Sequence, residues 1–313
     1  MRMNAQTTPM TTRKIKPERI SGKDNWIMIL MCLPVFVSLL VFNYIPMLGV
    51  VMAFQEFRAD LGIFNSSWVG FDNFVFFFTS GDAMRVTFNT VFLNALFIIA
   101  GTVAAVVIAL LLFEVVKKWL IKVYQTFMIL PSFLSWVVVG FMTYALFSST
   151  MGLLTWDGGI RWYEDASVWP AILTIAVVWK NVGLNCIIYY AGLMNVNQEY
   201  YEAAAIDGAG KLKQAWYISL PSLVPLISIM TILAIGGIMR ADFGMFYNLT
   251  RDVPVLYPTT DVIDTFVFRM LRVVPLGEGM GAAVGLYQSV VGFVLIVVTN
   301  MIVNKFQPDN ALF

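Results

Sequence analysis

Lys180 is the one ionisable side chain well inside a long apolar segment, and three polar residues accompany it. Asn181, Asn185 and Tyr189 recur every four residues, so they would share one face of a helix. Amide, phenol and ammonium groups in an apolar setting can hydrogen-bond a hydroxyl-rich solute. Burying the ammonium costs about 2.5–3.5 kcal/mol on insertion scales, so we expect it to have a role. Two interpretations stay open: contact with a solute, or polar contacts between helices with Lys180 bonded to neighbouring carbonyls.

Gln288 is the amide on the last apolar segment that could complete this polar group. If the fourth and sixth apolar segments face each other, Gln288 would lie at a membrane depth similar to that of Asn185. Small residues run along the same segment: Gly281, Gly285, Ser289 and Gly292. Close helix packing explains these small residues fully, so we assign them no chemistry.

A second group of polar residues, the segment 201–221, lies between two apolar segments. Its first part, Tyr201-Glu202-Ala203-Ala204-Ala205, favours a helix, and Asp207-Gly208 supplies a stop. Residues 211–217 can restart a helix before Pro221. A short helix held just outside the bilayer is what a membrane domain would present to a soluble partner.

The run Gly208-Ala209-Gly210-Lys211 is only superficially similar to the end of a phosphate-binding loop. Leu212 follows where such a loop needs Ser or Thr, and Ala205 stands in the place of its first glycine. We therefore expect no nucleotide site in this chain.

Composition places the chain in a membrane. Apolar residues make up 59% of it and charged residues 12%, about half the usual charged share. Such a chain cannot hide its apolar surface inside one soluble core. The net charge of +1 gives no sign of nucleic-acid binding, and the absence of histidine removes the commonest general base and a common metal ligand. Cys32 and Cys186 lie in apolar runs, which favours two buried thiols over a disulfide.

Six segments are long and apolar enough to cross a bilayer by the ~20-residue criterion, which predicts an all-α, polytopic, six-span membrane fold. They are Trp26–Tyr44, Val86–Phe113, Thr126–Phe147, Val168–Gly192, Ser222–Met239 and Ala282–Val303. Pro131 in the third segment and Pro225 in the fifth are tolerated where neighbours satisfy the freed backbone groups. Residues 1–25 are polar and are predicted to be a flexible cytoplasmic tail rather than a signal peptide, which leaves 26–313 as the membrane domain.

The distribution of positive charge predicts the orientation. With the N-terminus inside, the cytoplasmic segments would hold Arg2, Arg13, Lys14, Lys16, Arg19, Lys23, Lys117, Lys118, Lys122, Lys211, Lys213 and Lys305. The outside segments would hold only Arg58, Arg85, Arg161, Arg240, Arg251, Arg269 and Arg272. Excess Lys and Arg belong on the cytoplasmic side, so we predict N-in and C-in, with the loop 193–221 in the cytoplasm.

Arginines and aspartates gather in the last outside segment. They are Arg240, Arg251, Arg269 and Arg272, with Asp242, Asp252, Asp261 and Asp264 among them. The arginines could attract an acidic solute, but mutual pairing at the surface is the interpretation we favour.

The segment 201–221 closely resembles the EAA loop of bacterial ABC-importer permeases, whose pattern is Glu-Ala-Ala, Asp-Gly-Ala, then Ile-x-Leu-Pro. Every place is filled, by Glu202, Ala203, Ala204, Asp207, Gly208, Ala209, Ile218, Leu220 and Pro221. The resemblance implies a type I ABC importer permease fold, not an enzyme, in which this loop contacts a separate ATPase. The ATPase-coupling residues that it implies are Tyr201, Glu202, Ala203, Ala204, Asp207, Gly208, Ala209 and Pro221. ATP and magnesium would be bound by the ATPase, and this chain would hold no cofactor and no metal.

Further resemblance points to the maltose-type sugar permeases. Trp68–Phe74 is similar to a segment before their second span, and Asp261–Phe268 resembles the lipoprotein-fed oligosaccharide branch, which includes importers of uronate-containing oligosaccharides. The resemblance implies import across the bacterial cytoplasmic membrane with a second homologous permease, two ATPases and an extracytoplasmic sugar-binding protein. A permease for peptides, phosphate or polyamines stays open, whereas an integral-membrane enzyme would need clustered catalytic groups that we do not find.

Overall fold

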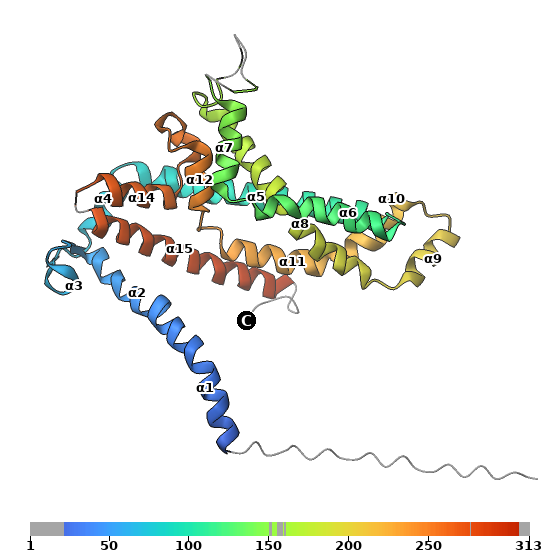
Figure 1. Cartoon of the computed structure of the whole chain (residues 1–313), viewed down its shortest axis with the longest axis horizontal. Coiled ribbons are helices and arrows are strands. Elements are labelled where there is room, and N and C mark those ends of the chain that lie inside the picture. The colour runs from blue at the N-terminus through green and yellow to red at the C-terminus, as the bar shows by residue number, and fades with distance from the viewer. Residues whose placement is uncertain (1–21, 150–151, 155–158, 160, 276, 307–313) are drawn as a thin grey trace, which may run out of the picture. The chain divides into compact units, whose positions relative to one another are not determined.

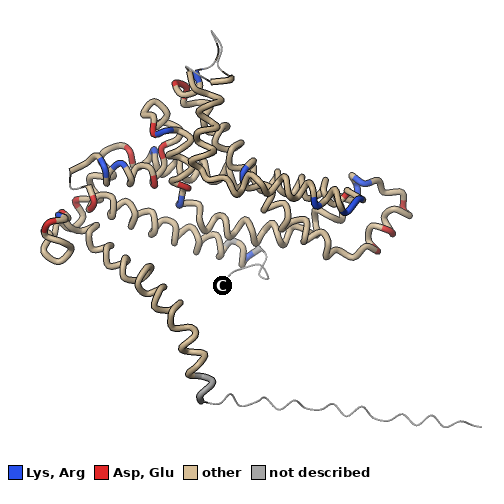
Figure 2. Tube along the Cα trace, in the orientation of Figure 1, with Lys and Arg blue, Asp and Glu red and all other residues tan. Residues whose placement is uncertain are grey.

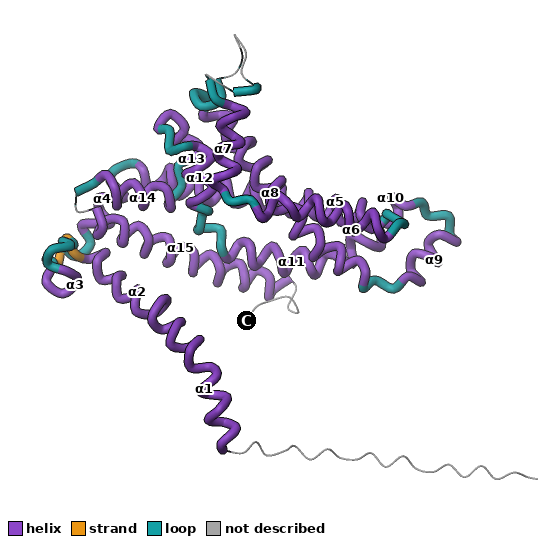
Figure 3. Tube along the Cα trace, in the orientation of Figure 1, coloured by secondary structure: helices purple, strands orange, loops and turns teal. Residues whose placement is uncertain are grey.

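The computed structural model describes residues 22–149, 152–154, 159, 161–275 and 277–306. Helices dominate these ranges (Figures 1 and 3). Their strands are one antiparallel pair, β1 (Gln55–Glu56) with β2 (Ser67–Trp68). Internal contacts divide the chain into two units, residues 1–49 and 50–313. The predicted all-helical membrane fold is confirmed, since within the described ranges five helices are long and apolar enough to span a bilayer and a bent pair adds a sixth candidate.

The first unit is a run of helical turns. It comprises α1 (Gly22–Leu39), the π-helical turn η1 (Leu40–Tyr44) and α2 (Ile45–Met47), and it continues into the 3-10 turn η2 (Leu48–Phe54). The helix begins four residues before the predicted boundary at residue 26, and residues 1–21 of the predicted tail lie outside the described residues. Every side chain from 26 to 48 is exposed within the chain, which an apolar helix tolerates only when lipid or another subunit covers it.

The second unit contains the remaining candidate spans. These are α5 (Asp82–Phe113), α8 (Trp169–Met194), the continuous run Lys211–Gly236, and α15 (Gly277–Phe306). Shorter elements join them: α3 (Gly62–Asn65), α4 (Asp72–Thr79), α9 (Gln198–Ile206), α12 (Phe243–Thr250), η6 (Pro254–Leu256), α13 (Tyr257–Thr260) and α14 (Ile263–Val273). Within this unit, α9 lies at one end of the long helices, and α4 and α14 lie at the opposite end (Figure 1).

The third predicted span differs from expectation. Instead of one helix over Thr126–Phe147, the chain forms α6 (Lys118–Ile129) with the 3-10 turn η3 (Leu130–Phe133), and then α7 (Trp136–Phe147), bent from it by 93°. Pro131 lacks a backbone N–H and cannot continue the hydrogen-bond ladder, and Leu134 is extended. The bent pair therefore leaves carbonyls in η3 without helical partners.

The fifth span begins earlier than predicted. Helix α10 (Lys211–Gln214), the π-helical turn η5 (Ala215–Ser219) and α11 (Leu220–Gly236) form one run. Pro221 therefore lies inside the run. The predicted span began directly after this proline, at Ser222, so that start is wrong. A π-helical turn precedes this proline, and the hydroxyl of Ser222 donates a hydrogen bond to the carbonyl of Ile218 at 2.7 Å.

Close helix contacts hold the second unit together. Helix α8 packs along both α5 and α6, while α7 packs against α12. A Cβ atom at Gly183 would lie 2.0 Å from the Met128 carbonyl oxygen, and one at Gly140 would lie 2.6 Å from that of Asn248. Glycine is required at both positions because any side chain would separate the backbones.

Candidate functional site

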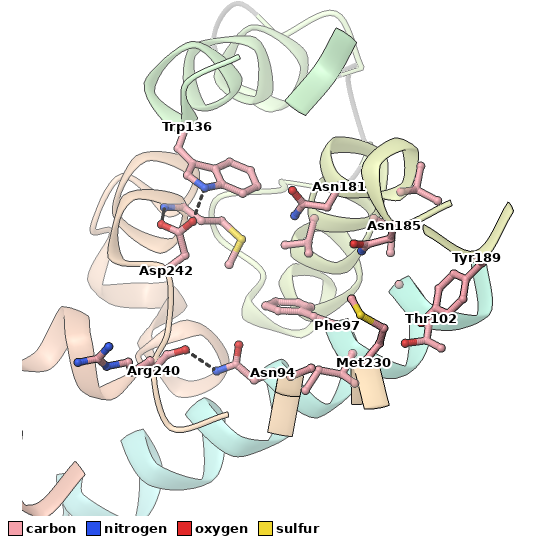
Figure 4. A pocket seen from close by; sticks show the side chains of 17 residues that line it. Asn94, Phe97, Thr102, Trp136, Asn181, Asn185, Tyr189, Met230, Arg240 and Asp242 are labelled. Carbon is pink, nitrogen blue, oxygen red and sulfur yellow. Dashed lines mark hydrogen bonds between the residues drawn. The ribbon is translucent and has the colours of Figure 1, made fainter. Parts of the chain in front are cut away.

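A cavity of about 330 Å³ lies among α5, α7, α8, α11 and the start of α12. Figure 4 shows its polar side chains around one space. Three of them are the predicted residues Asn181, Asn185 and Tyr189, which α8 places one helical turn apart. The sequence prediction that these three share a face is confirmed.

Asn181 and Asn185 are half-buried, and the side chain of neither makes a hydrogen bond within the part of the chain that the structure describes. Tyr189 is 2% exposed, and its phenol interacts with the hydroxyl of Thr102. Two amides thus face a partly apolar cavity with free donors and acceptors. Such groups can bind a polar ligand, because the ligand would supply the hydrogen bonds that they lack.

Residues that the sequence reasoning missed complete the cavity. The amide of Asn94 donates to the Ile238 carbonyl at 2.9 Å and thereby ties α5 to the segment after α11. The indole N–H of Trp136 donates to the carboxylate of Asp242, which also accepts from the backbone N–H of Met245 at 3.1 Å and so caps α12 (Figure 4). Asn94 was detectable as one of the two asparagines in the predicted span Val86–Phe113.

Lys180 lies outside the cavity lining and inside the α6–α7 bend. Its ammonium donates to the carbonyls of Ser132 at 2.8 Å and Leu134 at 2.5 Å, and it lies 5.3 Å from the centre of the Trp136 ring. The lysine is 9% exposed, so these carbonyls take the place of water. Of the two interpretations of Lys180, this geometry favours the structural one, because the ammonium satisfies carbonyls that the bend releases.

Gln288 is also separate from the cavity. Its amide donates to the Met239 carbonyl at 2.6 Å and to the Asp264 carboxylate at 3.0 Å. No described residue of α15 lines the cavity, so α5 and α11 occupy the place that we had expected α15 to take. Burial, the largest influence, raises the pKa of Asp264, while hydrogen bonds from Ala241 and Gln288 oppose that shift.

Of the four arginines in this group, only Arg269 forms ion pairs among the described residues, and it does so in the interior rather than at the surface. Asp261 has a fully buried side chain and binds Arg269 at 2.5 Å and Arg85 at 3.2 Å. Arg269 also lies 3.3 Å from Asp252, which accepts a hydrogen bond from the Tyr257 phenol at 2.9 Å. Burial raises the pKa of Tyr257 to about 12. The expectation of surface pairing is wrong because α5, α13 and α14 enclose Asp261.

The predicted helix–stop–helix element is confirmed. The side chain of Asn197 accepts the Glu199 N–H at 3.1 Å and starts α9, which ends at Ile206. Gly208 then adopts φ +79°, and the Ala209 N–H returns to the Ala204 carbonyl at 2.8 Å. Only glycine accepts this left-handed conformation without strain, which explains its place after Asp207.

Tyr201 anchors this element to the spans. Its phenol shares a buried hydrogen bond with the Ser219 hydroxyl at 2.9 Å, and its ring lies 5.5 Å from that of Phe113. Gln214 donates to the Ala209 carbonyl at 3.0 Å and closes the loop. Tyr201 therefore holds the base of α9, whereas other predicted coupling residues face outward.

The outward face of α9 and its loop includes the predicted residues Glu202, Ala203, Asp207 and Gly208, while Ala204 and Ala209 are half-buried. Ile206 is 86% exposed and Leu212 is 85% exposed. Both are large apolar side chains at the tip of a loop that also carries charged residues. Among the described residues, no group of three Cys, Asp or Glu side chains could hold a metal ion.

The fold and these two sites define a class of protein. Several membrane-spanning helices enclose a cavity with unpaired amides, and a short helix with an exposed apolar face lies at one end of the bundle. This arrangement is that of a membrane transport subunit rather than an enzyme.

The family follows from comparison with known proteins. The family model "Binding-protein-dependent transport system inner membrane component" matches residues 98–308, and the chain belongs to this family of ABC importer permeases. Protein LplB of Bacillus subtilis (strain 168) is 34% identical over 92% of this chain and 91% of its own length.

Two further relatives carry more descriptive names. The polygalacturonan/rhamnogalacturonan transport system permease protein YteP of the same organism is 33% identical over 90% of this chain and 88% of its own length. A chain in the crystal structure of a bacterial alginate ABC transporter, in complex with an alginate pentasaccharide-bound periplasmic protein, is 30% identical with a TM-score of 0.79. That match covers 91% of this chain and 96% of the other, and it confirms the type I ABC importer permease fold.

Proposed function

We propose that this chain is one of two permease subunits of an ATP-driven importer for acidic oligosaccharides. The observation that carries the proposal is the pair of half-buried amides, Asn181 and Asn185, which face the cavity without partners among the described residues. A sugar that leaves water loses hydrogen bonds, each costing about 1–3 kcal/mol if left unreplaced. These amides can replace part of that loss, and the ring of Trp136 offers an apolar face for the sugar ring.

The names of the relatives support the class of sugar. YteP is named for polygalacturonan and rhamnogalacturonan, and the structural relative was solved with a protein that holds an alginate pentasaccharide. Polygalacturonan and alginate are both polymers of uronic acids, so each sugar unit carries a carboxylate. We therefore infer an oligosaccharide with uronate units as the substrate.

The partners are inferred from the exposed α9 element. A motor outside this chain must supply the energy, and Ile206 and Leu212 offer it an apolar contact beside Glu202. We assign this contact to one of two ATPase subunits, which would bind ATP and magnesium. An extracytoplasmic sugar-binding protein would deliver the substrate to the opposite end of the helices, and closure of the ATPases would move α9 and, through Tyr201, the spans.

The orientation follows from charge. The end of the bundle that carries α9 also carries Lys117, Lys118, Lys122, Lys211 and Lys213 (Figure 2). Excess lysine and arginine favour the cytoplasmic side, so this end would face the cytoplasm and both termini would lie on the cytoplasmic side of the bacterial cytoplasmic membrane. The ATPases would then have access to ATP.

The test is uptake by the assembled importer with Asn185→Leu. Leucine removes the amide with little change of volume, so assembly should persist, while uptake of radiolabelled oligogalacturonate should fall by about tenfold, the equivalent of one lost hydrogen bond of about 1.4 kcal/mol. Asn65→Leu is the matched control, because Asn65 lies in α3 outside the cavity and its side chain bonds, among the described residues, only to the Leu61 carbonyl.

The outcomes are distinct. Reduced thermal stability with unchanged uptake per assembled complex would assign Asn185 to helix packing. Uptake of oligopeptides, phosphate or polyamines by the wild-type importer, without uptake of oligogalacturonate, would overturn the substrate class.

A further inference from the structure

A second cavity, of about 590 Å³, lies where α5 ends, α6 begins and α9 starts. Its walls are both apolar and basic. Phe113, Ile121 and Met194 supply apolar surface, and the lysines around it are Lys118, Lys122 and Lys211. Figure 2 shows a group of blue segments at this end of the bundle, near the start of α6 and at α10, in addition to those elsewhere in the chain.

The positive charges of two of these lysines are not balanced by a carboxylate among the described residues. Lys118 and Lys122 lie four residues apart on α6, so they share one face of that helix. Neither forms an ion pair with any residue that the structure describes. The carboxylate in the cavity wall, Glu114, already binds Lys211 at 3.1 Å. The cavity therefore presents two free ammonium groups to an anion.

The cavity continues into an apolar groove. A depression of about 250 Å³ between α5 and α6 is lined by Ile108, Leu111, Leu112, Val115, Tyr124, Phe127 and Met128. Val115 lines both the basic cavity and the groove, so the two meet at this residue. Phe127 is 69% exposed and Leu111 is 66% exposed, which leaves the groove open on the outer surface of the helices within this chain.

Aromatic residues mark the depth of this place in the bilayer. Trp119, next to Lys118, is 62% exposed, and Tyr124 at the groove is 46% exposed. Trp and Tyr concentrate where hydrocarbon meets headgroups, because their rings are apolar and their N–H and O–H groups seek water. The basic cavity thus lies at headgroup level and the groove lies deeper, at acyl-chain level.

We propose that the cavity and groove bind an anionic phospholipid, with its phosphate at Lys118 and Lys122 and one acyl chain along the groove past Val115. A zwitterionic lipid would bring a positive group beside its phosphate and so a second cation close to the two lysines, and a free phosphate would leave the groove empty. Basic pockets between spans at the cytoplasmic face are suited to anionic headgroups. The wall formed by Gln198 and Tyr201 places this lipid against the base of α9.

The assembled importer, purified in detergent, tests the proposal with a phosphatidylglycerol that carries a photoactivatable diazirine in one acyl chain. We expect saturable labelling of this chain, mapped by peptide sequencing to residues 108–128. Unlabelled phosphatidylglycerol should compete with the probe, whereas phosphatidylcholine and glycerol phosphate should compete at least tenfold less well.

The variant Lys118→Gln/Lys122→Gln should weaken labelling about thirty-fold, the equivalent of about 2 kcal/mol for two charges near a headgroup. Lys213→Gln is the matched control, because Lys213 is exposed on α10 and does not line the cavity. Val115→Trp, which fills the junction of cavity and groove, should weaken labelling without changing any charge.

Four results would overturn the proposal. They are equal competition by phosphatidylcholine, equal competition by glycerol phosphate, equal loss in Lys213→Gln, and no labelling of residues 108–128 in the assembled complex. The last result would assign the cavity to contact with a partner subunit.

Discussion

Replacing Gly183 with alanine tests the contact between α6 and α8. The added Cβ would lie 2.0 Å from the Met128 carbonyl oxygen, whereas real Cβ atoms essentially never approach closer than 3.0 Å. The helices must therefore separate by about 1 Å at this point, which costs about 1–3 kcal/mol as overpacking. Lys180, one turn earlier on α8, would be drawn from the Ser132 carbonyl, now 2.8 Å away, with the loss of a charge-assisted bond of about 1.5–3 kcal/mol.

The net expectation is a destabilisation of about 1.5–5 kcal/mol, since alanine returns about 1 kcal/mol of helix propensity. This corresponds to a fall of at least about 3 °C in the apparent Tm of the purified complex, scanned at one fixed rate because membrane complexes often unfold irreversibly. Gly101→Ala is the control, because nothing lies within 4 Å of its added Cβ. If Gly183→Ala melts at the same temperature as Gly101→Ala, the close approach of α6 to α8 is wrong.

Three further outcomes are expected. Glu202→Lys and Gly208→Pro should insert at normal levels, because both positions lie in the exposed loop, yet both variants should abolish sugar uptake. At residue 208 the reason is that proline cannot adopt φ +79°. Normal uptake by either variant would contradict the coupling role. The purified chain should show no saturable ATP binding in equilibrium dialysis, because Leu212 and Ala205 break the phosphate-loop pattern. Burial raises the pKa of Asp264 from 3.8, so its contribution to stability is fully present below pH 3.8 and lost as the pH rises through the raised pKa. The stability of wild type relative to Asp264→Asn, measured by thermal unfolding across this range, should therefore increase as the pH falls, and an unchanged difference would refute this assignment.

Features of the fold were predictable where one local physical signal determines them. A continuous apolar run specifies a span because no polar backbone group can be left in lipid, and this reasoning located α5, α8 and α15. The stop at Asp207-Gly208 was predictable because a left-handed residue must follow the helix there. The spans and the stop both depend on residues that are adjacent in the sequence, so the sequence alone predicts them.

Features that depend on several helices were not predictable in the same way. The 93° bend at Pro131 was read as a tolerated kink, because proline alone does not show whether a neighbouring helix can satisfy the released carbonyls. Asp261 was expected at the surface, because its two arginine partners lie 8 and 176 residues away in sequence and only the packed fold encloses them. Gln288 was assigned to the solute path from its depth, but depth says nothing about which helices are neighbours.

Helix α8 connects the bend to the cavity. Lys180 and Gly183 are three residues apart. Lys180 donates hydrogen bonds to the carbonyls of Ser132 and Leu134 at the end of η3, and the backbone at Gly183 closely approaches that of α6. Asn181 and Asn185 lie on a neighbouring face and line the cavity. Because α7 begins at Trp136, directly after the bend, the contacts of Lys180 also fix where that indole meets the cavity. The intramembrane charge therefore shapes the cavity from outside it, which accounts for a buried lysine that does not line the cavity.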